Sequence, residues 1–291
     1  MANLIQLLVS GISIGAIYAL IALGLLTIYR ASQVVNFAQG EFVMLGGMMS
    51  YWFWNTVHLP YWLAAVITVV VVAVVGLVMY QLVIAPLRNA SLAMVILATL
   101  GVSSLIQAIA LLWWDTWPVY GPAFSGEAPV SIGSVGLRTQ DLWIIGMAVA
   151  VVGALWFLNN HTHLGKTMTA AATEPLAAGF VGIRAGALIR LAFVISAGIG
   201  AIAGIFMSPV IPFTFNVGGV LVIKGFVAAV LGGWGTASGA MVGGIALGVI
   251  ETLVGGYLPS GFQDAIAFVI LILVLTLLPG GLLRQKLITA S

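Results

Sequence analysis

Three polar side chains lie in one string of six residues inside a long apolar stretch. The string NFAQGE contains Asn36, Gln39 and Glu41, and no further charge follows until Arg88. If the surrounding apolar runs cross a membrane, Glu41 lies where a carboxylate is costly and is therefore a functional candidate. The adjacent Gly40 favours a distorted or discontinuous helix beside a cavity. The alternative is a Glu41 at the membrane boundary that pairs with Arg30.

A second acidic residue, Glu251, closes a glycine-rich segment and has a similar status. The alternative interpretation is that Glu251 also lies at the membrane boundary. We interpret Lys224 and Asp264 as residues that mark the ends of spans. The candidate lining of a substrate pathway is therefore Asn36, Gln39, Glu41 and Glu251.

The sequence offers no arrangement that would support enzymatic chemistry. The string HLGKT at 163–167 ends like a phosphate-binding loop, but that motif needs a glycine at position 160, which is Asn160. His161 and His163 lack a neighbouring carboxylate or cysteine cluster, and the chain has no cysteine. We therefore predict no catalytic residues, no metal site and no cofactor.

Composition excludes a water-soluble globular protein. Of the 291 residues, 62% are hydrophobic and only 5% are charged, and the mean hydropathy is +1.22. So few charges cannot solvate a particle of this size, so most of its exterior must face lipid. The nine basic residues are spread singly, which excludes a nucleic-acid surface.

The gaps between charges predict an all-α polytopic bundle of about eight transmembrane helices, which forms one domain over residues 1–291. A helix needs about 20 apolar residues to cross the hydrocarbon. The expected spans are 4–29, two within 42–87, about 91–114, 141–158 and 191–208, the segment 225–256, and 263–281. The opening residues lack the basic start of a signal peptide, so we expect them to be retained. Loop 115–140 is expected outside, with a small hairpin at PVSIGSVGLR.

The basic residues predict which loops face the cytoplasm. With the N-terminus outside, the inner loops would hold Arg30, Arg88, Lys166, Arg184 and Arg190, and the outer ones Arg138 and Lys224. Eight simple spans would leave the basic residues at 284 and 286 outside, against the rule. We therefore expect the segment 225–256, which is too long for one straight span and rich in glycine, to be broken inside the membrane.

Glycines at a spacing of four predict close helix packing, because small residues on one face let two backbones approach. The interpretation is either ordinary packing or a mobile interface along a pathway. The candidate packing or gating residues are Gly232, Gly233, Gly235, Gly239 and Gly243.

The loop 159–190 is expected on the cytoplasmic side as two short helices joined by a turn near residues 173–175. A short helix with small side chains suits docking into a groove of a soluble partner; the alternative is a plain connector. The candidate coupling residues are Gly165, Ala170, Glu174, Pro175, Ala178, Gly179 and Gly182.

Five segments, taken in order, resemble one known family. They are VVNFAQGEFVMLGG at 34–47, TLGVSSLIQ at 99–107, HLGKTMTAAATEPLAAGFVGI at 163–183, KGFVAAVLGGWGTASGAMVGGIALGVIE at 224–251 and AFVILILVLTLLPGGLL at 267–283. This combination resembles the permease subunits of branched-chain (leucine/isoleucine/valine type) amino acid ABC importers.

The resemblance implies a multi-pass subunit of the bacterial inner membrane that carries branched-chain or other small amino acids. It also implies four partners, namely a second homologous permease in a heterodimer or homodimer, two cytoplasmic ATP-binding subunits and a periplasmic substrate-binding protein. The loop 163–183 would contact the ATPase. Two alternatives remain: the same architecture carrying urea or short amides, and an ion-coupled secondary transporter or channel that uses Glu41 and Glu251.

Overall fold

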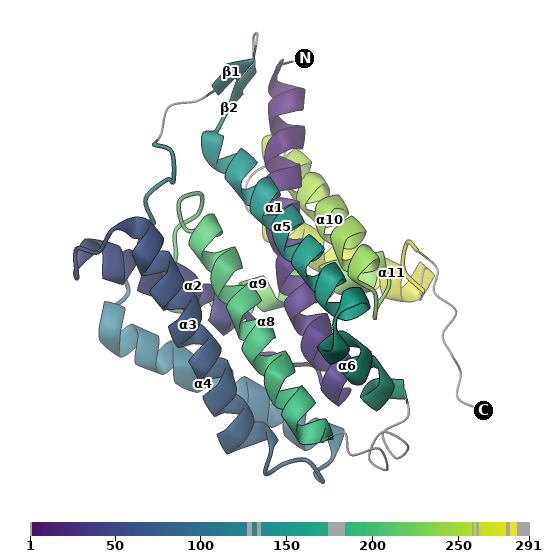
Figure 1. Cartoon of the computed structure of the whole chain (residues 1–291). Coiled ribbons are helices and arrows are strands. Elements are labelled where there is room, and N and C mark those ends of the chain that lie inside the picture. Colours follow the sequence, from purple (N-terminus) through teal and green to yellow (C-terminus); the bar gives the residue numbers. More distant parts are fainter. Residues whose placement is uncertain are drawn as a thin grey trace.

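The computed structural model describes residues 2–126, 130–132, 135–173, 184–257, 259, 262–277 and 280–283. It is a bundle of helices arranged around a long N-terminal helix (Figure 1). Several residues of the predicted coupling loop lie outside the described residues, namely Glu174, Pro175, Ala178, Gly179 and Gly182.

Most helices follow the predicted spans, but the predicted segment 225–256 corresponds to two helices. The first half contains α1 (Ala2–Ser32), α2 (Gln39–Asn55), α3 (Tyr61–Met79), the π-helical turn η1 (Tyr80–Ile84) and α4 (Leu92–Trp114). The second half contains α5 (Thr139–His161), α6 (His163–Thr173), α8 (Ala185–Met207), α9 (Val217–Gly232), α10 (Ala237–Tyr257) and α11 (Phe262–Leu277).

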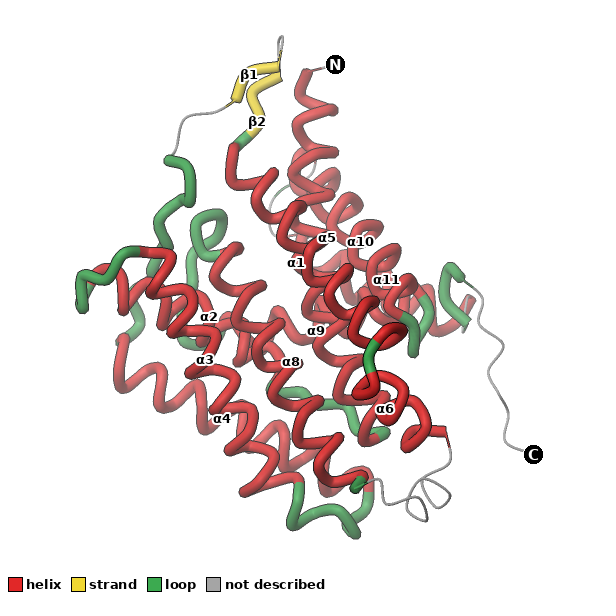
Figure 2. The backbone as a smooth tube through the Cα atoms, viewed as in Figure 1, coloured by secondary structure: helices red, strands yellow, loops and turns green. Residues whose placement is uncertain are grey.

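The predicted small hairpin is confirmed. Strands β1 (Val130–Ile132) and β2 (Val135–Leu137) pair antiparallel, with Ser131 opposite Gly136. In the described part of the chain, strands occur only in this hairpin, which lies beside the N-terminus (Figure 2). The predicted loop 115–140 therefore ends with the first residues of α5.

The polytopic helical fold is confirmed. Among the described residues, six helices are long and apolar enough to cross a membrane, and two shorter apolar helices, Val217–Gly232 and Ala265–Leu277, accompany them. In lipid, each backbone polar group must be bonded within its own segment, so even the Val-rich α3 is helical despite its β-branched residues. The apolar faces of α3, α4 and α5 are largely exposed and would face lipid.

Helix α1 is the centre of the bundle. In the most apolar 18-residue stretch of α1, 83% of the residues are buried, whereas in that of α5 only 17% are buried. It packs against α5, α8, α9 and α10, while α2 packs against α3, α8 and α9. The polar residues of α2 therefore face protein rather than lipid.

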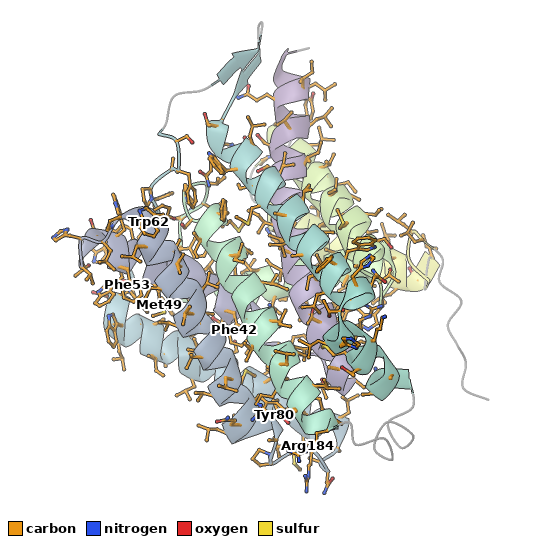
Figure 3. The ribbon with its side chains drawn as sticks, viewed as in Figure 1. Phe42, Met49, Phe53, Trp62, Tyr80 and Arg184 are labelled. Carbon is orange, nitrogen blue, oxygen red and sulfur yellow. The ribbon has the colours of Figure 1, made fainter. Side chains whose placement is uncertain are left out.

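The two ends of the bundle differ in chemistry. Trp52 and Trp113 pack edge to face at the end where α2 and α4 finish, with ring centroids 6.0 Å apart. Trp62 lies near this end, and Arg184 lies at the opposite one (Figure 3). Aromatic rings are enriched at both membrane boundaries, whereas basic residues are typical of the cytoplasmic side.

The glycine-rich segment is broken, as the sequence predicted, but the break is a turn between two antiparallel helices. Helix α9 ends at Gly232 and α10 begins at Ala237. Trp234, within the turn, packs against Tyr29 in the last turn of α1, with centroids 5.0 Å apart. The turn therefore lies level with the end of α1, rather than in the middle of the bundle.

The described residues that follow α11 pack against the α9–α10 hairpin. The last described turn, residues 280–283, lies at the same end of the bundle as the turn between α9 and α10, because it bonds to the last turn of α9. The amide of Leu282 donates to the carbonyl of Leu231 (2.8 Å), and that of Leu283 to Gly232 (3.3 Å). These bonds satisfy carbonyls that the end of α9 leaves unpaired.

The interpretation of Lys224 as a span boundary is wrong. Helix α9 begins at Val217, before the predicted start at 225, and Lys224 lies buried in its interior. A lysine inside an apolar run can be buried when a partner of opposite charge lies beside it.

Candidate functional site

Helix α2 begins inside the bundle. After α1 ends at Ser32, non-helical backbone leads to Gln39, the first residue of α2. The Gln39 side chain reaches the interiors of two other helices. Its Nε2 donates to the carbonyl of Ser196 in α8 (3.1 Å), and its Oε1 lies 2.7 Å from the Ser196 hydroxyl. That hydroxyl also lies 2.7 Å from the carbonyl of Gly24 in α1.

Asn36 shapes the connection that precedes α2. Its Oδ1 accepts a hydrogen bond from the amide of Ala38 (3.0 Å), which closes a local turn. The next amide, of Phe37, donates to the Thr99 hydroxyl of α4 (3.3 Å). Asn36 is fully buried, and its Nδ2 has no hydrogen-bond partner among the described residues.

Glu41 is fully buried and is held by α4. The Ser103 hydroxyl and Gln107 Nε2 each donate to its Oε1 at 2.8 Å. Its Oε2 has no hydrogen-bond partner within the described chain, but it faces Gly218 in the first turn of α9. A helix N-terminus carries partial positive charge, which favours a carboxylate there. The alternative in which Glu41 pairs with Arg30 at a boundary is wrong.

Replacing Gln107 with leucine should destabilise the protein by about 1–3 kcal/mol, because it removes one donor to a buried carboxylate. The exposed Gln81 of η1 supplies the matched control, since Gln81→Leu should change stability by less than about 0.5 kcal/mol. Thermal unfolding in detergent measures both. Equal stability of the two variants would contradict the described role of Gln107.

Two glycines bring α2 and α9 into backbone contact. A Cβ built on Gly40 would collide with the Gly218 carbonyl, and one built on Gly218 would collide with the Glu41 carboxylate. On the other side of α2, a Cβ on Gly204 of α8 would meet the carbonyl of Val43. Helix α2 is therefore held between two backbones at distances that only small residues allow.

Helices α1 and α10 share the most extensive contact among the described helices. A Cβ on Gly15 would lie 2.6 Å from the Cα of Ile245, and one on Gly11 would lie 2.8 Å from the Cα of Val249. Gly248 faces the backbone of Gly15 in turn. Two glycine series at a spacing of four thus face each other.

The glycines singled out in 232–243 fall into two groups. A Cβ on Gly232 would collide with Gly239, and one on Gly243 with the Ala228 carbonyl, so these three lie where α9 and α10 touch. Gly233 (φ 112°) and Gly235 (φ 104°) form the turn, in a conformation that L side chains rarely adopt.

Glu251 lies in the interior of the bundle, so its interpretation as a boundary residue is wrong. It is 6% exposed, and its Oε1 accepts from Lys224 Nζ in an ion pair between α10 and α9. The two charges sit on facing arms of one helical hairpin. The two acids have different partners, since Glu41 bonds to α4 and Glu251 pairs with α9.

The first helix of the predicted coupling loop is α6. A single residue, Thr162, separates it from α5, and it packs against α5 and α1. The Thr162 hydroxyl accepts from the amide of Gly165 (3.2 Å), which caps the helix start. A Cβ on Gly165 would collide with the Leu158 carbonyl, whereas Ala170 is exposed on the far turn of α6.

A family model described as "Branched-chain amino acid transport system / permease component" matches residues 7–275. The chain belongs to this permease family. The match includes every helix that contributes the polar residues described above, so it spans the whole bundle rather than one motif.

Curated relatives of this permease cover almost its full length. It is 30% identical to the high-affinity branched-chain amino acid transport system permease protein LivH of Escherichia coli (strain K12), over 97% of this chain and 96% of the relative. It is 29% identical to BraD of Pseudomonas aeruginosa, over the same shares. A shorter match, 32% over 66% of the permease, is to the autoinducer 2 import system permease protein LsrC of Klebsiella pneumoniae.

Several polar residues of the permease were missed from sequence. Ser103 and Gln107 are four residues apart, on one helix face, so their joint approach to Glu41 could have been found from that spacing. Ser196 carried no such signal. Tyr18 lies inside an apolar helix, and its ring lies 5.6 Å from Lys224 Nζ.

Proposed function

We propose that this chain is a membrane-spanning subunit of an ATP-driven importer for branched-chain amino acids in a bacterial inner membrane. One observation carries the proposal: relatives named as branched-chain amino acid permeases match it over nearly their whole length. The import system would add a second homologous permease, two ATP-binding subunits and a periplasmic binding protein. The energy for transport would then come from partner chains.

The buried polar groups support a transport role. A scaffold subunit would gain nothing from Glu41, Gln39 and the Lys224–Glu251 pair, because charges inside the membrane are costly. Asn36, Gln39, Glu41 and Glu251 are therefore proposed to line or gate the pathway. The glycine contacts between α1 and α10, and between α2 and its neighbours, would be the surfaces that shift during alternating access.

The segment 159–190 is proposed to contact the ATPase from the cytoplasm. Its described first helix, α6, lies with the end of α1 and the start of α8 on one side of the bundle (Figure 1). The opposite side carries the N-terminus and the β-hairpin. A helix fixed to α1 and α5 in this way can pass a push from a soluble subunit to the centre of the bundle.

Reconstitution with the products of neighbouring genes tests this function. We expect proteoliposomes that contain the complex, ATP on the cytoplasmic face and loaded binding protein to accumulate radiolabelled leucine or valine. Accumulation should stop without ATP and should not respond to an ion gradient. Uptake driven by an ion gradient alone would instead identify a secondary transporter, and uptake of urea but not leucine would identify the amide-carrying alternative.

A further inference from the structure

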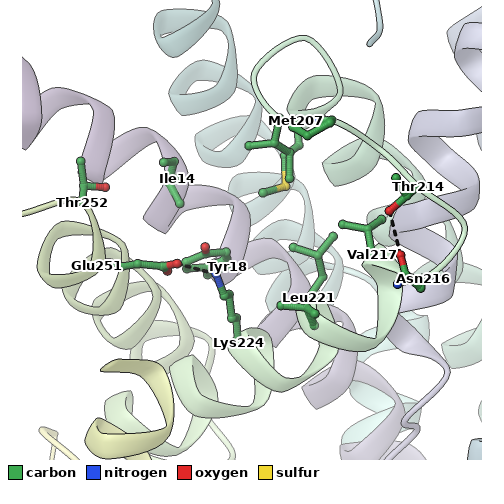
Figure 4. A pocket seen from close by; sticks show the side chains of 13 residues that line it. Ile14, Tyr18, Met207, Thr214, Asn216, Val217, Leu221, Lys224, Glu251 and Thr252 are labelled. Atoms are coloured by element: carbon green, nitrogen blue, oxygen red, sulfur yellow. Dashed lines mark hydrogen bonds and ion pairs between the residues drawn. The ribbon is translucent and has the colours of Figure 1, made fainter. Parts of the chain in front are cut away.

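A cavity lies between α1, α9, α10 and the connection from α8 to α9. Its volume is about 360 Å³, within the range of small-molecule sites in proteins. Figure 4 shows the side chains that line it, with Lys224 and Glu251 pointing toward each other beside Tyr18. The cavity is separate from the Glu41 cluster, whose residues do not line it.

One wall of the cavity carries charged side chains, and two of its polar atoms lack hydrogen-bond partners. Glu251 and Lys224 are 6% and 8% exposed, and they form the ion pair described above. Within the described residues, neither Glu251 Oε2 nor the Thr252 hydroxyl has a hydrogen-bond partner, although both atoms are buried. Buried polar atoms are rarely left unpaired, so these two mark a place where a ligand could bond.

The remaining lining is mostly apolar, apart from Thr214 and Asn216, whose side chains bond to each other (2.8 Å). Its apolar side chains include Ile14, Met207, Val217 and Leu221. A molecule that suits both walls carries a cation and an anion at one end and an aliphatic group at the other. A simple inorganic ion would leave the apolar wall without a partner.

The charged wall lies deep in the bundle. Tyr18, whose ring is beside Lys224, occupies the middle of the 31-residue α1. Substrate sites in transporters lie near the middle of the membrane. An ion pair that served packing alone would gain little at this depth, because apolar residues of similar volume are often at least as stabilising.

We propose that this cavity binds an α-amino acid by its zwitterionic head. Glu251 and the Thr252 hydroxyl accept hydrogen bonds from the ammonium group, Lys224 donates to the carboxylate, and the aliphatic side chain packs against Ile14 and Leu221. The proposal rests on the proposed function, since it assigns a substrate site to an amino acid permease. It places recognition of the head group in the membrane subunit as well as in the binding protein.

Equilibrium binding of radiolabelled L-leucine tests the site. The permease complex is placed in lipid nanodiscs without the binding protein, so that only the membrane site is measured. Thr252→Val should weaken leucine binding about tenfold, because a hydrogen bond to a charged group is lost. Thr68→Val is the matched control. Thr68 is also fully buried, with a hydroxyl that has no partner in the described chain, but it lies in α3 away from the cavity. Leucine should bind Thr68→Val as it binds the wild type.

Competition by leucine analogues tests the role of each charge. 3-Methylbutylamine lacks the carboxylate and 4-methylpentanoate lacks the ammonium, so each should compete at least about tenfold less well than leucine. The proposal is overturned if the wild type shows no saturable leucine binding, if Thr252→Val binds like Thr68→Val, or if either analogue equals leucine. ATP-driven leucine uptake by the wild type is measured in parallel. If uptake persists while the binding test fails, only the site is wrong; if uptake is absent, the proposed function fails.

Discussion

Replacing Lys224 with methionine should lower the free energy of unfolding by about 3–5 kcal/mol, because it leaves Glu251 as an uncompensated buried charge. Glu251→Gln should have a similar effect, since it leaves the lysine without its counter-ion. Both changes act where α9 and α10 pack against each other, and each leaves one buried charge without its partner. Unfolding of the purified protein in detergent, followed by fluorescence, measures the loss.

A double replacement separates stability from transport. With Lys224→Met and Glu251→Met together no charge is buried, so stability should return to within about 1 kcal/mol of the wild type or exceed it. The double variant should not take up leucine, because its cavity has neither the positive nor the negative charge. If each single variant were as stable as the double, the ion pair would not exist in the membrane-embedded protein.

Replacing Gly248 with leucine should destabilise the bundle by about 3 kcal/mol or more and reduce the amount of folded protein. The new side chain would enter space occupied by the backbone of Gly15, and backbone cannot move aside as a side chain can. Helix α1 is central, so a displaced α10 would also disturb its contacts with α8 and α9.

Gly153 provides the control for this substitution. It lies in the interior of α5, and a Cβ built on it meets no atom of the described residues within 4 Å. Gly153→Leu should therefore be neutral or slightly stabilising, since leucine favours helix more than glycine does. The amount of folded protein and the melting temperature in detergent are measured for both variants. Similar values for the two variants would mean that α1 and α10 do not approach as described.

Charge spacing predicted most of the helices because the hydrocarbon imposes a minimum length and excludes charge. That logic failed at Lys224, where a buried partner removed the constraint. The pair was still accessible to sequence reasoning. A turn at 233–236 folds α9 and α10 against each other, so a lysine on one arm and an acid on the other could have been expected to meet.

Among the other candidate residues, some contacts were visible in local spacing and others depended on the fold. Ser103 and Gln107 share a helix face, so only their pairing with Glu41 required the fold. The contact of Gln39 with Ser196 spans 157 residues and depends on how α2 packs against α8. No local spacing contains that information. The facing glycines of α1 and α10 were likewise visible as two separate series, but not as partners.

The α9–α10 hairpin constrains how the chain enters the membrane during synthesis. Helix α9 has only 16 residues and carries Lys224, while α10 carries Glu251. A single charge at the centre of a helix costs about 2.5–3.5 kcal/mol at the insertion machinery. The two helices therefore insert most favourably as one neutral unit, after synthesis has passed Glu251. Until then the growing chain must hold α9 outside the lipid or against α1.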